Sequence, residues 1–231
     1  MINMFKVIRP SLFVIIPICT LVSYCYLKST GTSDLKTMYQ TIFGGIPLKD
    51  PLLKGLFIMI LSLLQYTLID YIEYYIDSSE YFFIRYKNKS KWLEALLKGA
   101  FIITATFVIM FYLLGLIFDF IYNNFSFIQT VNIITVGVVL RVFLFCMIIV
   151  LLQIFLLLKY TKTTTFMILG GISILLAITS YYRGTLFYIL PRSSSPLNVL
   201  FDVLKSIVLS IVLITLIQRI NHKRELIMHE N

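Results

Sequence analysis

Charged side chains are scarce in this chain. Asp, Glu, Lys and Arg make up 13% of its 231 residues, whereas about a quarter of the residues of an ordinary soluble domain are charged. Hydrophobic residues make up 59%. This composition predicts an integral membrane protein, whose length is best counted in bilayer crossings of about 20 residues each.

The motifs of nucleotide, hydrolase and metal chemistry are missing as well. The chain has no Walker-type phosphate loop, no GxGxxG, no HExxH and no GxSxG. Its two histidines, His222 and His229, lie in the C-terminal tail, and Cys19, Cys25 and Cys146 fall inside apolar runs without metal-ligand spacing. We therefore expect no catalytic residues, no cofactor and no metal, and we expect free thiols.

Six apolar runs divide the chain. The predicted spans cover residues 11–27, 51–72, 99–118, 133–158, 163–182 and 203–220. We expect an all-α fold with one transmembrane domain over residues 1–231. Gly170 and Gly171 give the fifth span a small-residue face on which another helix can approach closely.

The basic residues predict the orientation. With both termini inside, twelve of the twenty Lys and Arg residues lie on the inner side and six on the outer side, and such a bias marks the cytoplasmic side. The net charge of +9 is spread over clusters beside apolar runs, which is typical of contacts with anionic lipid headgroups and not of a nucleic-acid surface.

Arg141 is a charged residue within the fourth span, about 12 Å from its outer end at 1.5 Å per residue. One interpretation is that it snorkels to the outer headgroups. The other is that it faces the bundle interior, where it pairs with Asp202 or lines a path for an anionic or amphipathic substrate. Because Asp70, Glu73 and Asp119 fall at span ends, a carboxylate-based ion-coupled transporter is disfavoured.

A basic, aromatic segment, residues 77–98, separates the second and third spans. Asn88 is a good N-cap, Glu94 precedes Lys98 by four residues, and Gly99 is a plausible end. The segment therefore predicts a short amphipathic helix of about ten residues that ends before the third span, with Trp92 on its apolar side. Two interpretations stay open: this side lies at the lipid headgroups, or it docks into a groove on a cytoplasmic partner.

The same segment carries a resemblance to a known family. Arg85-Tyr86, Lys89 and Trp92-Leu93 resemble the Arg-Tyr-Gly-Ser-Arg-x-x-Trp segment that opens the coupling helix in ABC type-2 permeases. The chain is most similar to the small bacterial permeases of antimicrobial-peptide or lantibiotic export and self-protection. Lys87 and Asn88 stand where Gly and Ser are usual, so the pattern covers about eight residues and departs at two.

The resemblance implies a six-span permease of the bacterial cytoplasmic membrane that recruits an ABC ATPase subunit and forms a homodimer, or a heterodimer with a second permease. Its substrate, a peptide or another amphipathic molecule, would pass between the second and fifth spans. The residues expected to couple to the ATPase are Arg85, Tyr86, Asn88, Lys89, Trp92, Leu93 and Leu96. The alternative is a non-transporting membrane protein that serves as an immunity or scaffold subunit and binds a toxin or signalling partner.

Overall fold

The structure, a computed structural model, describes residues 17, 18, 20–22, 25, 51–77, 89–123, 133–179 and 196–229. Every one of these residues is helical except those of the turn at 158–161. The long helices are α3 (Pro51–Asp77), α5 (Lys89–Asn123), α7 (Ile133–Leu157), α8 (Lys162–Thr179) and α9 (Pro196–His229). The prediction of an all-α fold is confirmed for the described part of the chain.

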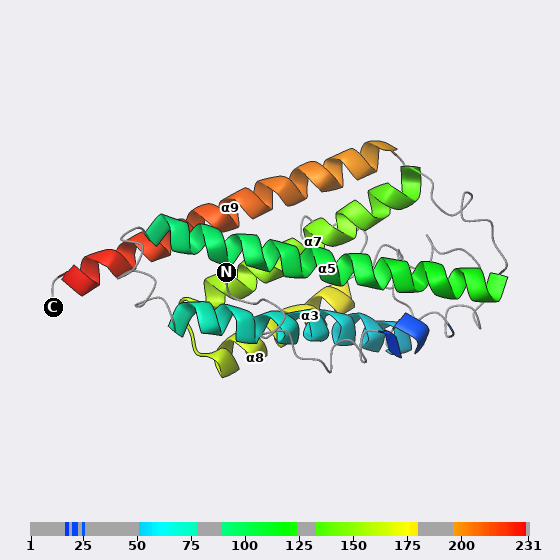
Figure 1. Cartoon of the computed structure of the whole chain (residues 1–231), viewed down its shortest axis with the longest axis horizontal. Helices are drawn as coiled ribbons and strands as arrows, with labels where there is room; N and C mark the ends of the chain where they lie inside the picture. The colour runs from blue at the N-terminus through cyan, green and yellow to red at the C-terminus, as the bar shows by residue number, and fades with distance from the viewer. Residues whose placement is uncertain are drawn as a thin grey trace.

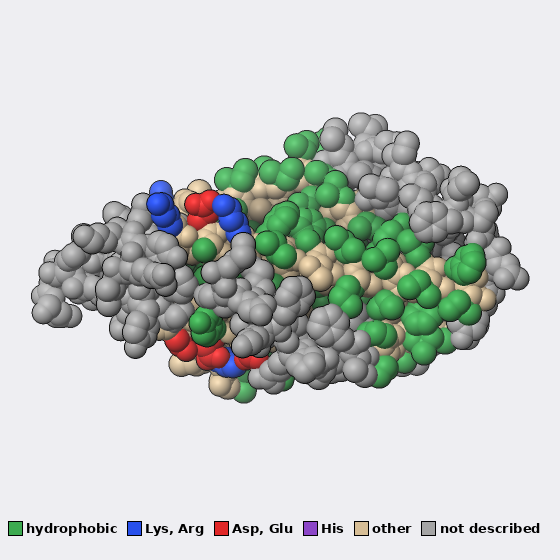
Figure 2. Space-filling model, in the orientation of Figure 1, with side chains coloured by type: hydrophobic (Ala, Val, Ile, Leu, Met, Phe, Trp, Pro, Cys, Tyr) green, Lys and Arg blue, Asp and Glu red, His purple; other side chains and the backbone are tan. Residues whose placement is uncertain are grey.

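Successive long helices run in opposite directions (Figure 1). As a result α3, α7 and α9 end, and α5 and α8 begin, at the left-hand side of the view. Charged side chains gather near this side, whereas hydrophobic side chains dominate the rest of the described surface in view (Figure 2). We call this side the charged end of the bundle.

Four of the helices are long and apolar enough to cross a membrane. The crossing segments are Lys54–Asp77, Lys91–Phe118, Val139–Leu157 and Val203–Asn221, which correspond to the second, third, fourth and sixth predicted spans. By length and composition the chain is a multi-pass membrane protein. The fifth predicted span corresponds to α8, whose 18 residues extend about 27 Å at 1.5 Å per residue. The first lies largely outside the described residues.

The predicted boundary between the amphipathic helix and the third span is wrong. Helix α5 continues without interruption from Lys89 to Asn123 over 35 residues, and Gly99 is buried within it. The segment around it, Leu96 to Phe101, supplies good helix formers on both sides, and a single glycine weakens a helix by only about 1 kcal/mol. The helical half of segment 77–98 is thus the beginning of a membrane-crossing helix.

The core lies between α3, α5 and α7. Its largest fully buried side chains include Phe57 and Tyr71 of α3, Phe111 of α5 and Phe145 of α7. The rings of Phe57 and Phe145 stack with centroids 6.3 Å apart. Lipid is as apolar as these side chains, so close packing and hydrogen bonds, more than burial from water, hold membrane helices together. Hydrogen bonds between helices are therefore important for how this bundle is held together.

The turn between α7 and α8 places a lysine against α3. The backbone N–H of Tyr160 donates to the carbonyl of Leu156 at 2.7 Å, which closes the end of α7. Thr161 is the N-cap of α8: the N–H of Thr164 points to its hydroxyl oxygen at 3.5 Å, and the two hydroxyls lie 3.0 Å apart. Lys162 is consequently the first residue of α8.

Candidate functional site

At the charged end, α3 and α5 are joined by two hydrogen bonds. The indole Nε1–H of Trp92 donates to the backbone carbonyl of Tyr75 at 2.9 Å in a buried contact. The hydroxyl of Tyr71 points to the carbonyl of Ala95 at 3.4 Å. Carbonyls in the last turn of a helix have no N–H donor within that helix. Because Trp92 donates to one of these carbonyls, the start of α5 caps the end of α3.

The apolar residues of the predicted coupling segment are turned inward. Trp92, Leu93 and Leu96 are 4%, 5% and 0% exposed and belong to the hydrophobic core. In the described residues this side of the helix is covered by the bundle itself, and docking of the segment on a partner stays a prediction. These three side chains contact the bundle because the segment opens a long helix that packs along α3.

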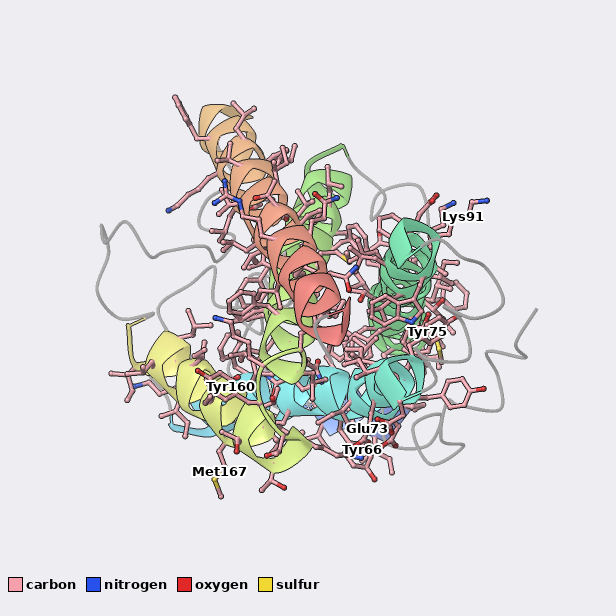
Figure 3. All side chains as sticks on the ribbon, turned by 90° about the vertical axis from the view of Figure 1, so that its left-hand side faces the viewer. Tyr66, Glu73, Tyr75, Lys91, Tyr160 and Met167 are labelled. Atoms are coloured by element: carbon pink, nitrogen blue, oxygen red, sulfur yellow. The ribbon has the colours of Figure 1, made fainter. Side chains whose placement is uncertain are left out.

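The polar side of the same helix faces outward. Lys91, Glu94 and Lys98 are exposed, and Lys98 Nζ lies 2.7 Å from Glu94 Oε1. This confirms the predicted pair at i,i+4. Lys91 lies at the outer rim of α5 in the end-on view (Figure 3). The predicted residues Arg85, Tyr86 and Asn88 lie outside the described residues, as does the side chain of Lys89.

A three-residue ion pair joins α3 to α8 at this end of the bundle. Lys162 Nζ donates to Asp70 Oδ1 at 2.9 Å and to Glu73 Oε2 at 2.6 Å. The two acids are three residues apart, so they lie on one face of α3. We call Lys162, Asp70 and Glu73 the lysine clasp.

The clasp is half exposed and keeps its charge. The hydrogen bonds from Lys162 to Glu73 and to Asp70, with the attraction of both carboxylates, raise the pKa of the lysine above its ordinary value, against a smaller opposing effect of burial. The side chain of Lys162 is 42% exposed, so water weakens the attraction and the free energy of a single such pair is modest.

Arg141 lies in the bundle interior. It is 3% exposed, and its Nε–H points to the carbonyl of Gly137 one turn earlier at 3.4 Å. This burial favours the interior placement over snorkelling, and pairing with Asp202 or a role in a substrate path stays a prediction. The side chain of Asp202, its predicted partner, lies outside the described residues.

A polar cluster joins α3, α7 and α8 in the interior. Gln153 Nε2 donates to the backbone carbonyl of Gln65 at 2.9 Å, and Gln65 Nε2 donates to Ser173 Oγ at 3.2 Å. All three side chains are buried. Sequence analysis missed both this cluster and the clasp, although Gln65 and Gln153 each interrupt an apolar run and Asp70 and Glu73 share a helix face.

Nothing in the described part of the chain forms a metal centre, since it contains no group of three or more His, Cys, Asp or Glu side chains that could hold an ion. A comparison of the chain with models of protein families, with curated proteins and with solved structures finds no match in any of the three. The described residues therefore form an all-helical, multi-pass membrane protein in which α3, α5 and α8 are joined at the charged end.

Proposed function

We propose that the chain is the permease subunit of an ATP-driven exporter of the ABC type, which moves a peptide or another amphipathic substrate with the help of a separate ATPase subunit. The observation that carries this proposal is the fastening of α3, α5 and α8 at the charged end. Trp92 joins α5 to α3, and the lysine clasp joins α3 to α8. A force applied to the segment between α3 and α5 would reach three helices.

The proposed mechanism depends on how a movement of this segment is transmitted to α3, α5 and α8. The segment between Asp77 and Lys89 connects α3 and α5 directly, so an ATPase that moves it acts on both helices. The Trp92 to Tyr75 bond keeps the two helix ends from separating. Lys162 lies at the first residue of α8, so α8 follows α3 through its ion pairs. Chemical energy released in the partner would then rearrange helices that face the substrate.

The surface offered to the ATPase follows from what is exposed. Trp92, Leu93 and Leu96 are buried, so we assign them a positioning role within the bundle. The docking surface that we propose consists of the outward side of early α5 and the preceding basic segment. Its members are Lys91, Glu94 and Lys98, with Arg85, Tyr86, Asn88 and Lys89 added by the resemblance to ABC type-2 permeases.

The proposed assembly has six spans per chain and both termini in the cytoplasm, which puts the charged end at the cytoplasmic face of a bacterial membrane. Two such chains, or one chain and a related permease, would sit on two ATPase subunits. The exposed acidic and basic side chains near this end (Figure 2) suit contact with both a soluble subunit and anionic headgroups.

The experiment is affinity purification of the tagged chain from its native membranes, with quantitative identification of bound proteins. Two single charge reversals form a matched pair, Lys91→Glu on the proposed surface and Lys159→Glu just after α7. Both lysines are exposed, so neither change should disturb folding. We expect Lys91→Glu to lower the recovered ATPase about tenfold and Lys159→Glu to leave it unchanged.

Two other outcomes of the purification would change the proposal. If no ATPase is recovered with the unaltered chain, the permease proposal is wrong, and recovery of a toxin or a sensor protein in its place would favour the immunity or scaffold alternative. If an ATPase is recovered equally with all variants, the chain is a permease whose ATPase binds elsewhere.

A further inference from the structure

Two buried glutamines from different helices have carbonyl oxygens with no donor among the described residues. Gln65 of α3 is 1% exposed and Gln153 of α7 is 0% exposed. The Oε1 atom of each is fully buried and accepts no hydrogen bond in this part of the molecule. An unsatisfied buried acceptor destabilises the fold, so two in one cluster call for an explanation.

The orientation of both amides follows from their neighbours. Gln153 Nε2 faces the backbone carbonyl of Gln65 at 2.9 Å, and turning this amide over would bring two oxygens together. Gln65 Nε2 faces Ser173 Oγ at 3.2 Å, and that hydroxyl already donates to the carbonyl of Leu169 at 2.9 Å. The network thus directs both N–H₂ groups to protein acceptors and leaves both oxygens for another donor.

The position of the cluster limits what the donor can be. Gln65 is five residues from Asp70 and eight from Glu73, so the two acids of the lysine clasp lie about 7.5 and 12 Å further along α3. The nearest acid along α3 is Asp70, more than one turn away. The site consists of neutral amide and hydroxyl oxygens within packed helices. It therefore accepts only a small ligand that is a hydrogen-bond donor or a cation.

We propose that Gln65, Gln153 and Ser173 form a binding site for one small donor, a water molecule or a monovalent cation, which bridges the two amide oxygens. A water molecule has two O–H groups, one for each oxygen, and buried waters typically satisfy such groups. A sodium or potassium ion offers the same chemistry to oxygen ligands. The ligand would link α3, α7 and α8 in the membrane interior, whether or not the chain recruits an ATPase.

The direct hydrogen bonds make a double-mutant cycle informative. Gln153 donates to the backbone of Gln65 and not to its side chain, so Gln65→Met leaves that bond in place. Gln153→Met likewise leaves the bond from Gln65 to Ser173. Without a bridging ligand, the two changes should lower the unfolding midpoint Tm independently. With one, the second change should cost less than the first because the bridge is already lost.

The measurement is thermal unfolding of the purified full chain in detergent micelles. We expect each single variant to lower Tm by about 2–4 °C and the double variant to lower it by clearly less than the sum. Thr104→Val is the matched control. Thr104 is a buried polar residue whose hydroxyl donates to the Ala100 carbonyl of its own helix at 2.8 Å, so its loss should combine additively with either glutamine change.

Two further arms distinguish the ligands. Replacing sodium and potassium with N-methylglucamine should lower the Tm of the unaltered chain, and not that of Gln65→Met, if the ligand is a cation. If the ligand is water, the cations have no effect, and radiolytic hydroxyl-radical labelling of the unaltered chain should modify side chains beside the cluster. Additive losses, with neither a cation effect nor labelling at the cluster, would overturn the proposal. If the variants do not fold, cation replacement and labelling of the unaltered chain decide it, because neither needs a variant.

Discussion

The indole nitrogen of Trp92, at the start of α5, donates to the backbone carbonyl of Tyr75, in the last turn of α3, over 2.9 Å. The two residues are seventeen positions apart in the chain, with the basic segment between them. This contact closes the base of a helical hairpin. It also explains why the only tryptophan of the chain is found here, since no other side chain combines a large ring with a single N–H donor.

Replacing Trp92 tests whether it acts inside the bundle. Trp92→Phe keeps a ring but removes the donor, so we expect Tm in micelles to fall by about 2–4 °C. Trp92→Asp places a charge in the core and should abolish recovery of folded protein. Helical circular dichroism is the measurement, because the substitution removes the tryptophan fluorescence. Tyr160→Phe, at an exposed residue, serves as the control. A Trp92→Phe variant with unaltered Tm would contradict the role of the hydrogen bond.

Replacing Lys162 tests the lysine clasp. Lys162→Met removes the ion pairs to Asp70 and Glu73, so we expect a Tm about 2–6 °C lower. Lys162→Arg should restore most of the loss, since a guanidinium also donates to two carboxylates. Lys159→Met is the matched control; this lysine lies 4.8 Å from the centre of the Phe155 ring and contacts no carboxylate in the described residues. Equal effects of the two methionine variants would show that the clasp contributes nothing.

The pH dependence of the clasp follows from the raised pKa of Lys162. A lysine whose pKa is higher in the folded chain stabilises fully below its unfolded value, and the contribution is lost as pH rises through the folded value. The ordinary value is 10.5. The difference in Tm between the unaltered chain and Lys162→Met should therefore be constant from pH 7 to about pH 10 and shrink above that. A difference that already disappears between pH 7 and pH 9 would contradict this assignment.

The apolar runs predicted the helices well where the pattern was long. The second, third, fourth and sixth spans each match a described membrane-length helix, because about twenty uncharged residues leave a membrane chain few other structures. Local signals also predicted the Glu94 to Lys98 pair correctly. Such contacts depend only on residues within one helix turn.

The boundaries and the interhelical contacts could not be predicted in the same way. Gly99 carries an end signal, yet packing of α5 along α3 favours a continuous helix. An amphipathic pattern shows that Trp92 and Leu96 share a side, but not whether lipid, a partner or α3 covers it. The clasp and the Gln65 to Ser173 bond join residues about 90 to 110 positions apart, and only the arrangement of helices in space reveals them.

Arg141 offers a direct test of that arrangement, because burial in the bundle predicts that a side chain at this position is out of reach of water. In a variant without the native cysteines, Arg141→Cys should resist a membrane-impermeant maleimide added from either side of the membrane, since this position is 3% exposed. Labelling should appear only after denaturation. Lys205→Cys, at an exposed position on α9, shows how a lipid-facing or interfacial site near the same end behaves. Rapid labelling of Arg141→Cys in intact membranes would reject the interior placement.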